Sequence, residues 1–261
     1  MHHEITQPSG LRGEFRELTV ADEDLLAAAS RTGKIAKQER ALDEMLRNCW
    51  VKTTDAGPYR KPTDEDESGS PRQFDLNDFV LGDKLWYALQ LRIESMGSEV
   101  AIPVECPGGH TFQHEYDLRD IKMLKLPDAA AKSLREGVPL SFKLPRCGRT
   151  VKYILMTGRM QVQFSKAVRD FPGEISTELL ASRIVEVSGF DEAGLDTETQ
   201  TNIRGWIRRL GMFDAKAFRE EMVKNDCGPD TNIKVKCDQC AREFTHDLMD
   251  GSGGFFDLAQ E

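Results

Sequence analysis

VECPGGHTFQHEYDL, residues 104–118, and KVKCDQCAREFTHDL, residues 234–248, are the two stretches that decide the fold of this chain. Each runs from V-x-C through a short turn to F-x-H. Apolar residues alternate on both sides of the first turn, and Ile233 and Val235 alternate before the second, which is typical of β-strands. The sequence therefore predicts two β-hairpins whose tips both carry cysteine.

The two tips together predict a structural zinc site made of Cys106, His110, Cys237 and Cys240. Zinc takes four thiolate or imidazole ligands in a tetrahedron, and each knuckle supplies two of them. The second tip is a true CxxC; the first is C-x₃-H, because Gly109 stands where its second cysteine would fall. A catalytic zinc would need an open position beside a general base, and the sequence contains no HExxH or HxE…CxxC pattern.

Other interpretations of these tips remain open. His114 or His246 could be the fourth ligand, although each lies two residues past a phenylalanine on a predicted strand. Alternatively, His110 is an idle residue of a decayed site, and Cys237 and Cys240 form a disulfide. A thiol oxidoreductase using the same CxxC is a further hypothesis, but the pair does not open a helix after a βαβ pattern.

The composition is that of a soluble globular protein: 261 residues, 39% hydrophobic, 30% charged, with a formal charge of -9. A nucleic-acid partner would need clustered Lys and Arg, and only short patches such as Arg204–Arg209 occur. No apolar run approaches the roughly 20 residues of a membrane span, and MHHEITQPSG lacks a signal-peptide core. His2 and His3 could contact a metal, but at a terminus we expect them to be solvated. We expect folding in a cytoplasm, where paired cysteines indicate metal rather than disulfides.

The N-terminal half predicts a short extended stretch, LRGEFREL, followed by helices. Thr19 is expected to cap the first helix, VADEDLLAAAS. Apolar residues at helical spacing predict a second helix that runs through Cys49 and Trp50. Lys61–Arg72 is acidic and lacks apolar residues, so it is expected to be a solvated loop. A leucine every four residues predicts a third helix over Gly82–Ser95.

After the first tip, the pattern predicts another hairpin and then helices. Val138–Leu144 and Val151–Leu155 alternate around a turn. Leu179–Val187 and Ile203–Leu210 carry apolar stripes at helical spacing, and Asp214 is expected to cap a last helix. The predicted fold class is α+β, with helices packed around β-hairpins and a zinc-ribbon-like pair of knuckles joining the middle and C-terminal segments.

No other chemistry is indicated. The chain contains no GxxxxGK[ST] loop, no GxGxxG after a strand and no GxSxG elbow. Cys49 lies on an apolar helix stripe, Cys147 in a predicted turn and Cys227 in a loop, so we expect structural positions for all three. We therefore assign no catalytic residue, no small-molecule substrate and no cofactor other than Zn²⁺.

Composition divides the chain into three segments. Residues 1–54 are predicted to form an N-terminal strand and helices, and residues 55–78 an acidic linker. Residues 79–261 are predicted to form a helical and hairpin body that contains both zinc knuckles, unless the whole chain is one continuous domain. Zinc would join segments about 130 residues apart and so close a loop whose entropy the core would otherwise have to offset.

The order of these features resembles the baseplate hub assembly protein family of T-even-type, contractile-tailed bacteriophages. The resemblance is carried by GEFRELTVADEDLL, ALDEMLRNCW, LGDKLWYALQLRIESMG, VECPGGHTF, CGPDTNIKVKC, CDQC and the C-terminal pair Phe255 and Phe256. It covers nearly the whole chain. The sequence departs from the family pattern at the first knuckle, where Gly109 replaces a cysteine and His110 the usual glycine.

The resemblance implies a structural or assembly component of the phage baseplate hub, built in the host cytoplasm and located in the virion tail. Its partners would be other baseplate and tail proteins, without nucleic acid or membrane. Phe255 and Phe256 follow a glycine-rich stretch and are expected to contact a partner or the chain's own core. The alternatives are a transient assembly chaperone absent from the virion and, less well supported, a zinc-ribbon adaptor or regulator.

Overall fold

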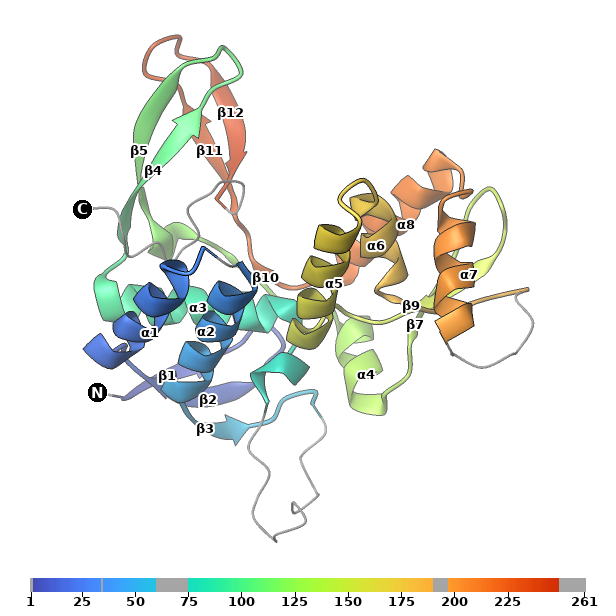
Figure 1. The fold of residues 1–261 in the computed structure, drawn as a ribbon, viewed down its shortest axis with the longest axis horizontal. Helices are drawn as coiled ribbons and strands as arrows, with labels where there is room; N and C mark the ends of the chain where they lie inside the picture. The colour runs from blue at the N-terminus through green and yellow to red at the C-terminus, as the bar shows by residue number, and fades with distance from the viewer. Residues whose placement is uncertain (1, 34, 60–74, 190–196, 249–261) are drawn as a thin grey trace, which may run out of the picture.

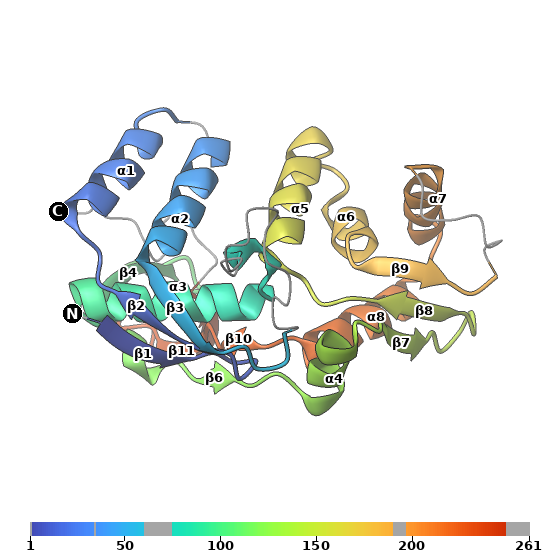
Figure 2. The ribbon, with the colours of Figure 1, turned by 90° about the horizontal axis from the view of Figure 1, so that it is seen from below.

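The computed structural model describes residues 2–33, 35–59, 75–189 and 197–248. Within these ranges the fold is mixed α+β, as predicted, with eight α-helices and small antiparallel sheets. Figure 1 shows a first lobe built from β1–β3 and α1–α3, a second lobe built from α4–α8 and β7–β9, and a finger of two hairpins projecting from the first lobe. Figure 2 shows α1, α2, α5, α6 and α7 standing on one side of the sheets.

The first lobe is a three-stranded sheet in the order β1-β2-β3, with β1 at His2–Thr6, β2 at Arg12–Arg16 and β3 at Trp50–Asp55. Its helices α1 (Val20–Ser30) and α2 (Ile35–Cys49) precede β3. Apolar side chains from the sheet, α2 and α3 form the core of this lobe: Ile5, Leu11, Phe15, Met45, Leu46, Cys49, Leu76, Phe79, Tyr87, Ala88 and Leu91.

Two predictions for this lobe need correction at one residue each. His2 is exposed as predicted, whereas His3 is half-buried in β1 and its ring stacks on Phe15 at 5.4 Å. Trp50 does not continue the second helix, because it pairs with Phe15 and starts β3. Thr19 is the N-cap of α1 as predicted; its backbone N–H donates to the carboxylate of Asp22 at 2.9 Å.

Helix α3 (Leu81–Met96) confirms the predicted helix and ends at Gly97, whose φ is 89°. The 3₁₀ turn η1 (Leu76–Asp78) precedes it. At Gly82 the helix touches the chain returning from the second lobe, since a Cβ there would lie 1.9 Å from the carbonyl oxygen of Cys227. Only glycine permits this approach, which fixes where the two lobes meet.

The second lobe has a sheet in the order β7-β8-β9, with bounds Leu140–Lys143, Thr150–Tyr153 and Ile184–Val187. Five helices surround it: α4 (Asp128–Glu136), α5 (Gly158–Asp170), α6 (Ile175–Ala181), α7 (Thr197–Ile207) and α8 (Met212–Asn225). The core combines the sheet with α6, α7 and α8: Leu144, Val151, Tyr153, Leu180, Ala181, Ile184, Val187, Ile203, Ile207, Ala215, Phe218 and Met222.

The structure corrects two expectations in this lobe. Helix α6 ends at Ala181, and the rest of the predicted stripe is strand β9, where Ile184 pairs with Tyr153. Asp214 is not the cap of α8, which begins at Met212 after Gly211. Its carboxylate instead accepts hydrogen bonds from two backbone N–H groups in the turn between β7 and β8, those of Arg146 and Cys147.

The finger consists of two antiparallel hairpins, β4 (Glu99–Glu105) with β5 (Thr111–Asp117), and β11 (Asn232–Lys236) with β12 (Glu243–Asp247). A small core of Val104, Ile233 and Val235 joins them. At its base, the turn η2 (Leu118–Asp120) leads to β6 (Met123–Leu124), which pairs with β10 (Gly228–Pro229).

The acidic stretch Lys61–Arg72 and the pair Phe255 and Phe256 lie outside the described residues. The division into 1–54, 55–78 and 79–261 stays a prediction. None of the helices in the described part of the chain is both long and apolar enough to cross a membrane.

Candidate metal centre

The four predicted zinc ligands lie together at the tip of the finger (Figure 1). Cys106 and His110 come from the turn between β4 and β5, and Cys237 and Cys240 come from the turn between β11 and β12. Cys106 and Cys237 are buried, His110 is half-buried and Cys240 is exposed. Packing of one hairpin on the other therefore brings residues from distant parts of the chain to one place.

The two turns differ in length by one residue. In the first, the N–H of Cys106 donates to the carbonyl of His110 at 2.9 Å; in the second, the N–H of Cys237 donates to the carbonyl of Arg242 at 2.9 Å. Each turn places one residue in the left-handed region, Gly109 at φ 81° and Ala241 at φ 56°. In sequence spacing Gly109 takes the place of a cysteine, but in backbone conformation it corresponds to Ala241.

Shortening of the first turn explains how His110 reaches the site. Because the turn closes one residue earlier, His110 follows the left-handed residue directly and begins the return toward β5. Its Nδ1 lies 3.4 Å from Sγ of Cys106 and 3.7 Å from Sγ of Cys237. Nδ1 is thus the nitrogen turned toward the sulfurs.

The separations of the ligand atoms fit a tetrahedral zinc. With a Zn–S length of about 2.3 Å and a Zn–N length of about 2.0 Å, the edges of a tetrahedron are roughly 3.8 Å between sulfurs and roughly 3.5 Å between sulfur and nitrogen. The sulfurs of Cys106 and Cys240 are 3.9 Å apart, and all four ligand atoms lie within 4.8 Å of one another. A Cys₃His set at these separations could hold zinc with little movement.

Local electrostatics also favour a cation at this point. Burial raises the pKa of Cys106, but hydrogen bonds from the backbone N–H groups of His110 and Gly108, together with the side chains of Cys237 and His110, lower it to about 6. A backbone hydrogen bond from Arg242 lowers the pKa of Cys240, but the neighbouring Cys237, burial and Cys106 together raise it above its usual value. Ionised Cys106 therefore hinders the ionisation of Cys240, and a divalent cation between the two sulfurs removes that conflict.

The competing histidines lie away from the cluster. His114 is opposite Ile102 within the β4–β5 hairpin, and His246 is opposite Ile233 within the β11–β12 hairpin. Cys106, His110, Cys237 and Cys240 are the one group of three or more potential ligands found in the described part of the chain. All six cysteines are free thiols in the structure. The assignment of these four as ligands stays a prediction.

Sequence reasoning missed the contributions of the turn backbone. The N–H of Gly108 donates a hydrogen bond to Sγ of Cys106 at 3.3 Å. In the sequence, the two glycines that permit this tight turn were the only indication of such a bond. The other cysteines occupy the expected structural positions: Cys49 is buried, Cys147 is exposed in the turn between β7 and β8, and Cys227 lies in the loop after α8. Burial raises the pKa of Cys49 to about 11.

Comparison with known families yields one match. The model of the family described as T4 bacteriophage base plate protein matches residues 2–257, which is nearly the whole chain. Comparison with curated proteins found no significant match, and neither did comparison with solved structures.

Proposed function

The chain belongs to the family of T4 bacteriophage base plate proteins, and from this premise we propose that it is a structural or assembly component of the hub region of a contractile tail baseplate. The family match over residues 2–257 is the observation that carries the proposal. The protein acts through contacts with other baseplate and tail proteins, without catalysis, and its location is the virion tail.

We further propose that Cys106, His110, Cys237 and Cys240 hold a structural Zn²⁺. The tetrahedral separations of their ligand atoms support this assignment. Bound zinc would supply a four-point cross-link between the hairpins. The zinc would hold the two hairpins together in addition to their small apolar core. The finger would then be a rigid projection that partner proteins can contact.

The role in the tail is tested by quantitative mass spectrometry of purified tails from the phage that encodes the chain. A fixed ratio to known hub proteins is expected for a component of the finished baseplate. Absence from tails, together with arrested baseplate assembly when the gene is deleted, would favour the transient chaperone. Normal baseplates in the deletion strain would refute both roles.

The metal is tested separately by elemental analysis of the purified protein, with His110→Ala and His114→Ala as a matched pair. One zinc per chain is expected in the wild type and in His114→Ala. Loss of a ligand should weaken binding in His110→Ala by more than the roughly 10- to 100-fold that follows loss of an outer-shell partner. Undiminished zinc in His110→Ala would move the fourth ligand elsewhere.

A further inference from the structure

A groove of about 540 Å³ separates α2 in the first lobe from α5 in the second. The two helices stand as neighbours in both ribbon views (Figures 1 and 2). Val162 is the one apolar residue among the described residues that line the groove, and the others carry charged or amide groups on their side chains. The groove is lined by Glu39, Arg40, Asp43, Glu44, Arg47, Asn77, Arg159, Val162, Gln163, Lys166 and Arg169.

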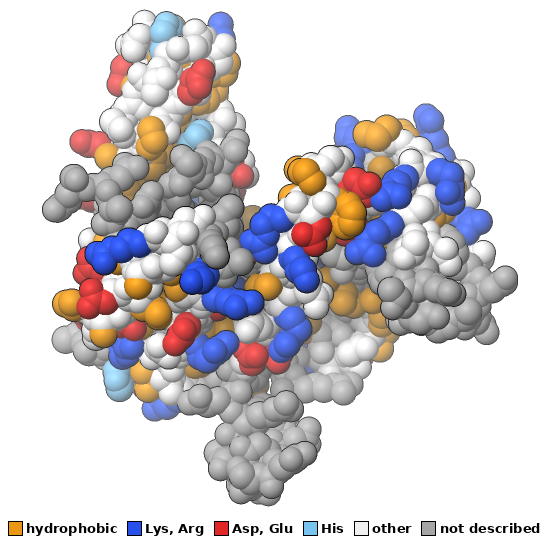
Figure 3. All heavy atoms as spheres, in the orientation of Figure 1, with side chains coloured by type: hydrophobic (Ala, Val, Ile, Leu, Met, Phe, Trp, Pro, Cys, Tyr) orange, Lys and Arg blue, Asp and Glu red, His pale blue; other side chains and the backbone are white. Residues whose placement is uncertain are grey.

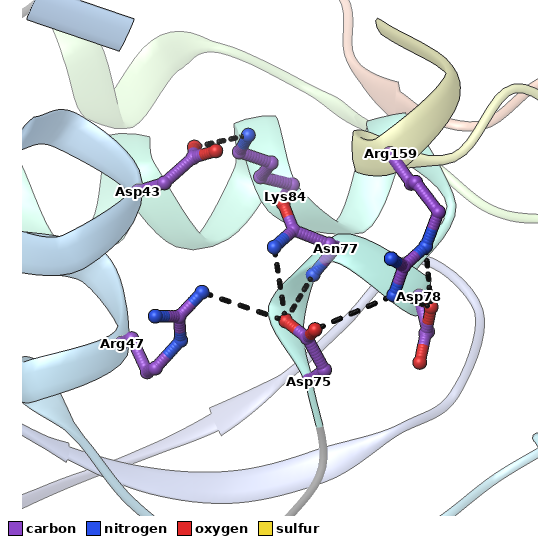
Figure 4. Close-up of polar contacts among 7 residues, drawn as sticks. All are labelled: Asp43, Arg47, Asp75, Asn77, Asp78, Lys84 and Arg159. Carbon is purple, nitrogen blue, oxygen red and sulfur yellow. Dashed lines mark hydrogen bonds and ion pairs between the residues drawn. The ribbon is translucent and has the colours of Figure 1, made fainter. Parts of the chain in front are cut away.

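Ion pairs tie the groove at both ends. At one end Arg169 of α5 contacts Glu39 in α2 at 3.3 Å. At the other end Arg159 contacts Asp78 at 2.9 Å and Asp75 at 3.4 Å, and Asp75 also lies 3.7 Å from Arg47 of α2 (Figure 4). The start of α2 is therefore level with the end of α5, so the helices run antiparallel with an open stretch between the two ties.

The floor of the groove is electrically neutral. Nζ of Lys84 from α3 lies 2.5 Å from the carboxylate of Asp43, and the two side chains are only 8% and 16% exposed. Figure 4 shows this pair beside the Asp75 network. Because Asp43 is paired with Lys84 and Glu39 with Arg169, two of the three acids lining the groove are already neutralised.

The open stretch keeps unpaired cations on both walls. Among the described residues, Arg40 on α2 and Lys166 on α5 form no ion pair, and both are exposed. Glu44 is the one lining acid left without an ion-pair partner within the same described ranges. Figure 3 shows Lys and Arg side chains along this face of α2 and α5, on a chain whose formal charge is -9. The middle of the groove is therefore locally positive on an otherwise acidic molecule.

We propose that this groove binds an acidic peptide segment of a neighbouring protein. Its carboxylates contact Arg40 on one wall and Lys166 on the other, and one apolar side chain covers Val162, which is 39% exposed. The ion pairs that close the groove at both ends confine the bound segment to the open stretch between them. Identification of the neighbour as a baseplate protein rests on the proposed function, whereas the preference for acidic peptide rests on the charges of the groove alone.

The test uses the full chain and a fluorescein-labelled helical peptide of Glu, Ala and Leu, about 14 residues or roughly four turns long. A second peptide with every Glu replaced by Lys is the charge control, and a single-stranded oligonucleotide tests for nucleic acid. Fluorescence anisotropy at about 0.05 M and about 0.5 M salt reports binding and its screening. The acidic peptide should bind, more weakly at high salt, and the basic peptide should not.

The matched variants carry the same change in charge at different places. Arg40→Glu with Lys166→Glu should weaken binding of the acidic peptide by at least about fivefold, because two exposed charge contacts become repulsive. Lys132→Glu with Lys216→Glu, on α4 and α8, should leave it unchanged; these side chains are 69% and 72% exposed. Equal weakening by both pairs, equal binding of both peptides, or tighter binding of the oligonucleotide would overturn the proposal without bearing on presence in tails.

Discussion

Removal of the metal should melt the finger and leave the two lobes folded. The fully buried core between the hairpins is small, because it consists of Val104, Ile233 and Val235 with partly buried apolar side chains around them. The four ligands at the tip are a further connection between the hairpins. The cores of the lobes lie elsewhere and contain no metal ligand. We therefore expect local opening of β4–β5 and β11–β12 when a strong chelator takes the zinc.

The size of the effect follows from the loop that the metal closes. Cys106 and Cys240 are 134 positions apart, which corresponds to about 5 kcal/mol of closure entropy in a fully unfolded chain. When only the finger opens, the pairing of Leu124 with Gly228 persists and excludes the second lobe from the loop. Roughly 30 residues remain, for which the same relation gives about 3.5 kcal/mol, or about 300-fold in the opening equilibrium.

Hydrogen exchange measured by mass spectrometry checks this prediction. Peptides from 99–117 and 232–247 should exchange up to about 300-fold faster after chelation, and peptides from β1–β3 and β7–β9 should not change. Re-addition of zinc should restore protection in the wild type but not in His110→Ala. Equal protection of the finger with and without zinc would show that its small core suffices and that the loop argument is wrong.

Three further predictions concern the lobes and the second turn. Hydrogen bonds from Arg16 and Thr19 lower the pKa of Asp22 from 3.8 to about 2. The ionised carboxylate therefore stabilises the folded state above about pH 4, and this stabilisation is lost as the pH falls toward 2. Asp22→Asn should therefore cost roughly 2 kcal/mol in urea unfolding at pH 7 and almost nothing near pH 2; a pH-independent cost would contradict the assignment. Gly82→Ala should destabilise the chain by about 3 kcal/mol or more, because the added Cβ would meet the carbonyl of Cys227. The control is Gly205→Ala inside α7, where the nearest atom is Nη1 of Arg209 at 3.9 Å; it should stabilise the chain by about 0.5–1 kcal/mol. Equal shifts of the thermal midpoint in the two variants would rule out the close approach at Gly82. Ala241 adopts a left-handed conformation that costs about 1–2 kcal/mol, and Ala241→Gly removes this cost. The greater freedom of glycine in the unfolded chain offsets part of the gain, so amide hydrogen exchange in the finger should slow only modestly. Faster exchange in the variant would contradict strain in this turn.

The candidate site could be predicted because its signals are local and repeated. Strand alternation fixes the hairpins, and the shared V-x-C and F-x-H patterns mark both tips as related. Turn length could not be predicted in the same way, because it depends on which residue adopts positive φ. A positive φ is readily expected at Gly109 because it is a glycine, whereas nothing in the sequence predicts a positive φ at Ala241.

Tertiary pairing accounts for the errors elsewhere. HHEIT has no strong strand pattern of its own, and β1 is defined by its register with β2. The stripe through Ile184 and Val187 fits a helix, but β8 offers an open edge and both residues are buried as β9. The groove between α2 and α5 had no sequence signal at all, because its charges belong to segments that become neighbours only through folding.

The short pairing of β6 with β10 makes the second lobe an insertion. The chain leaves the first lobe after Leu124 and returns at Gly228, and these two residues face each other in an antiparallel ladder. Such a pair can be joined by a two-residue turn. Such a turn would remove the second lobe and retain all four metal ligands, but it would also uncover Val80, which shares a buried cluster with Leu126, Ala130 and Leu155 of that lobe.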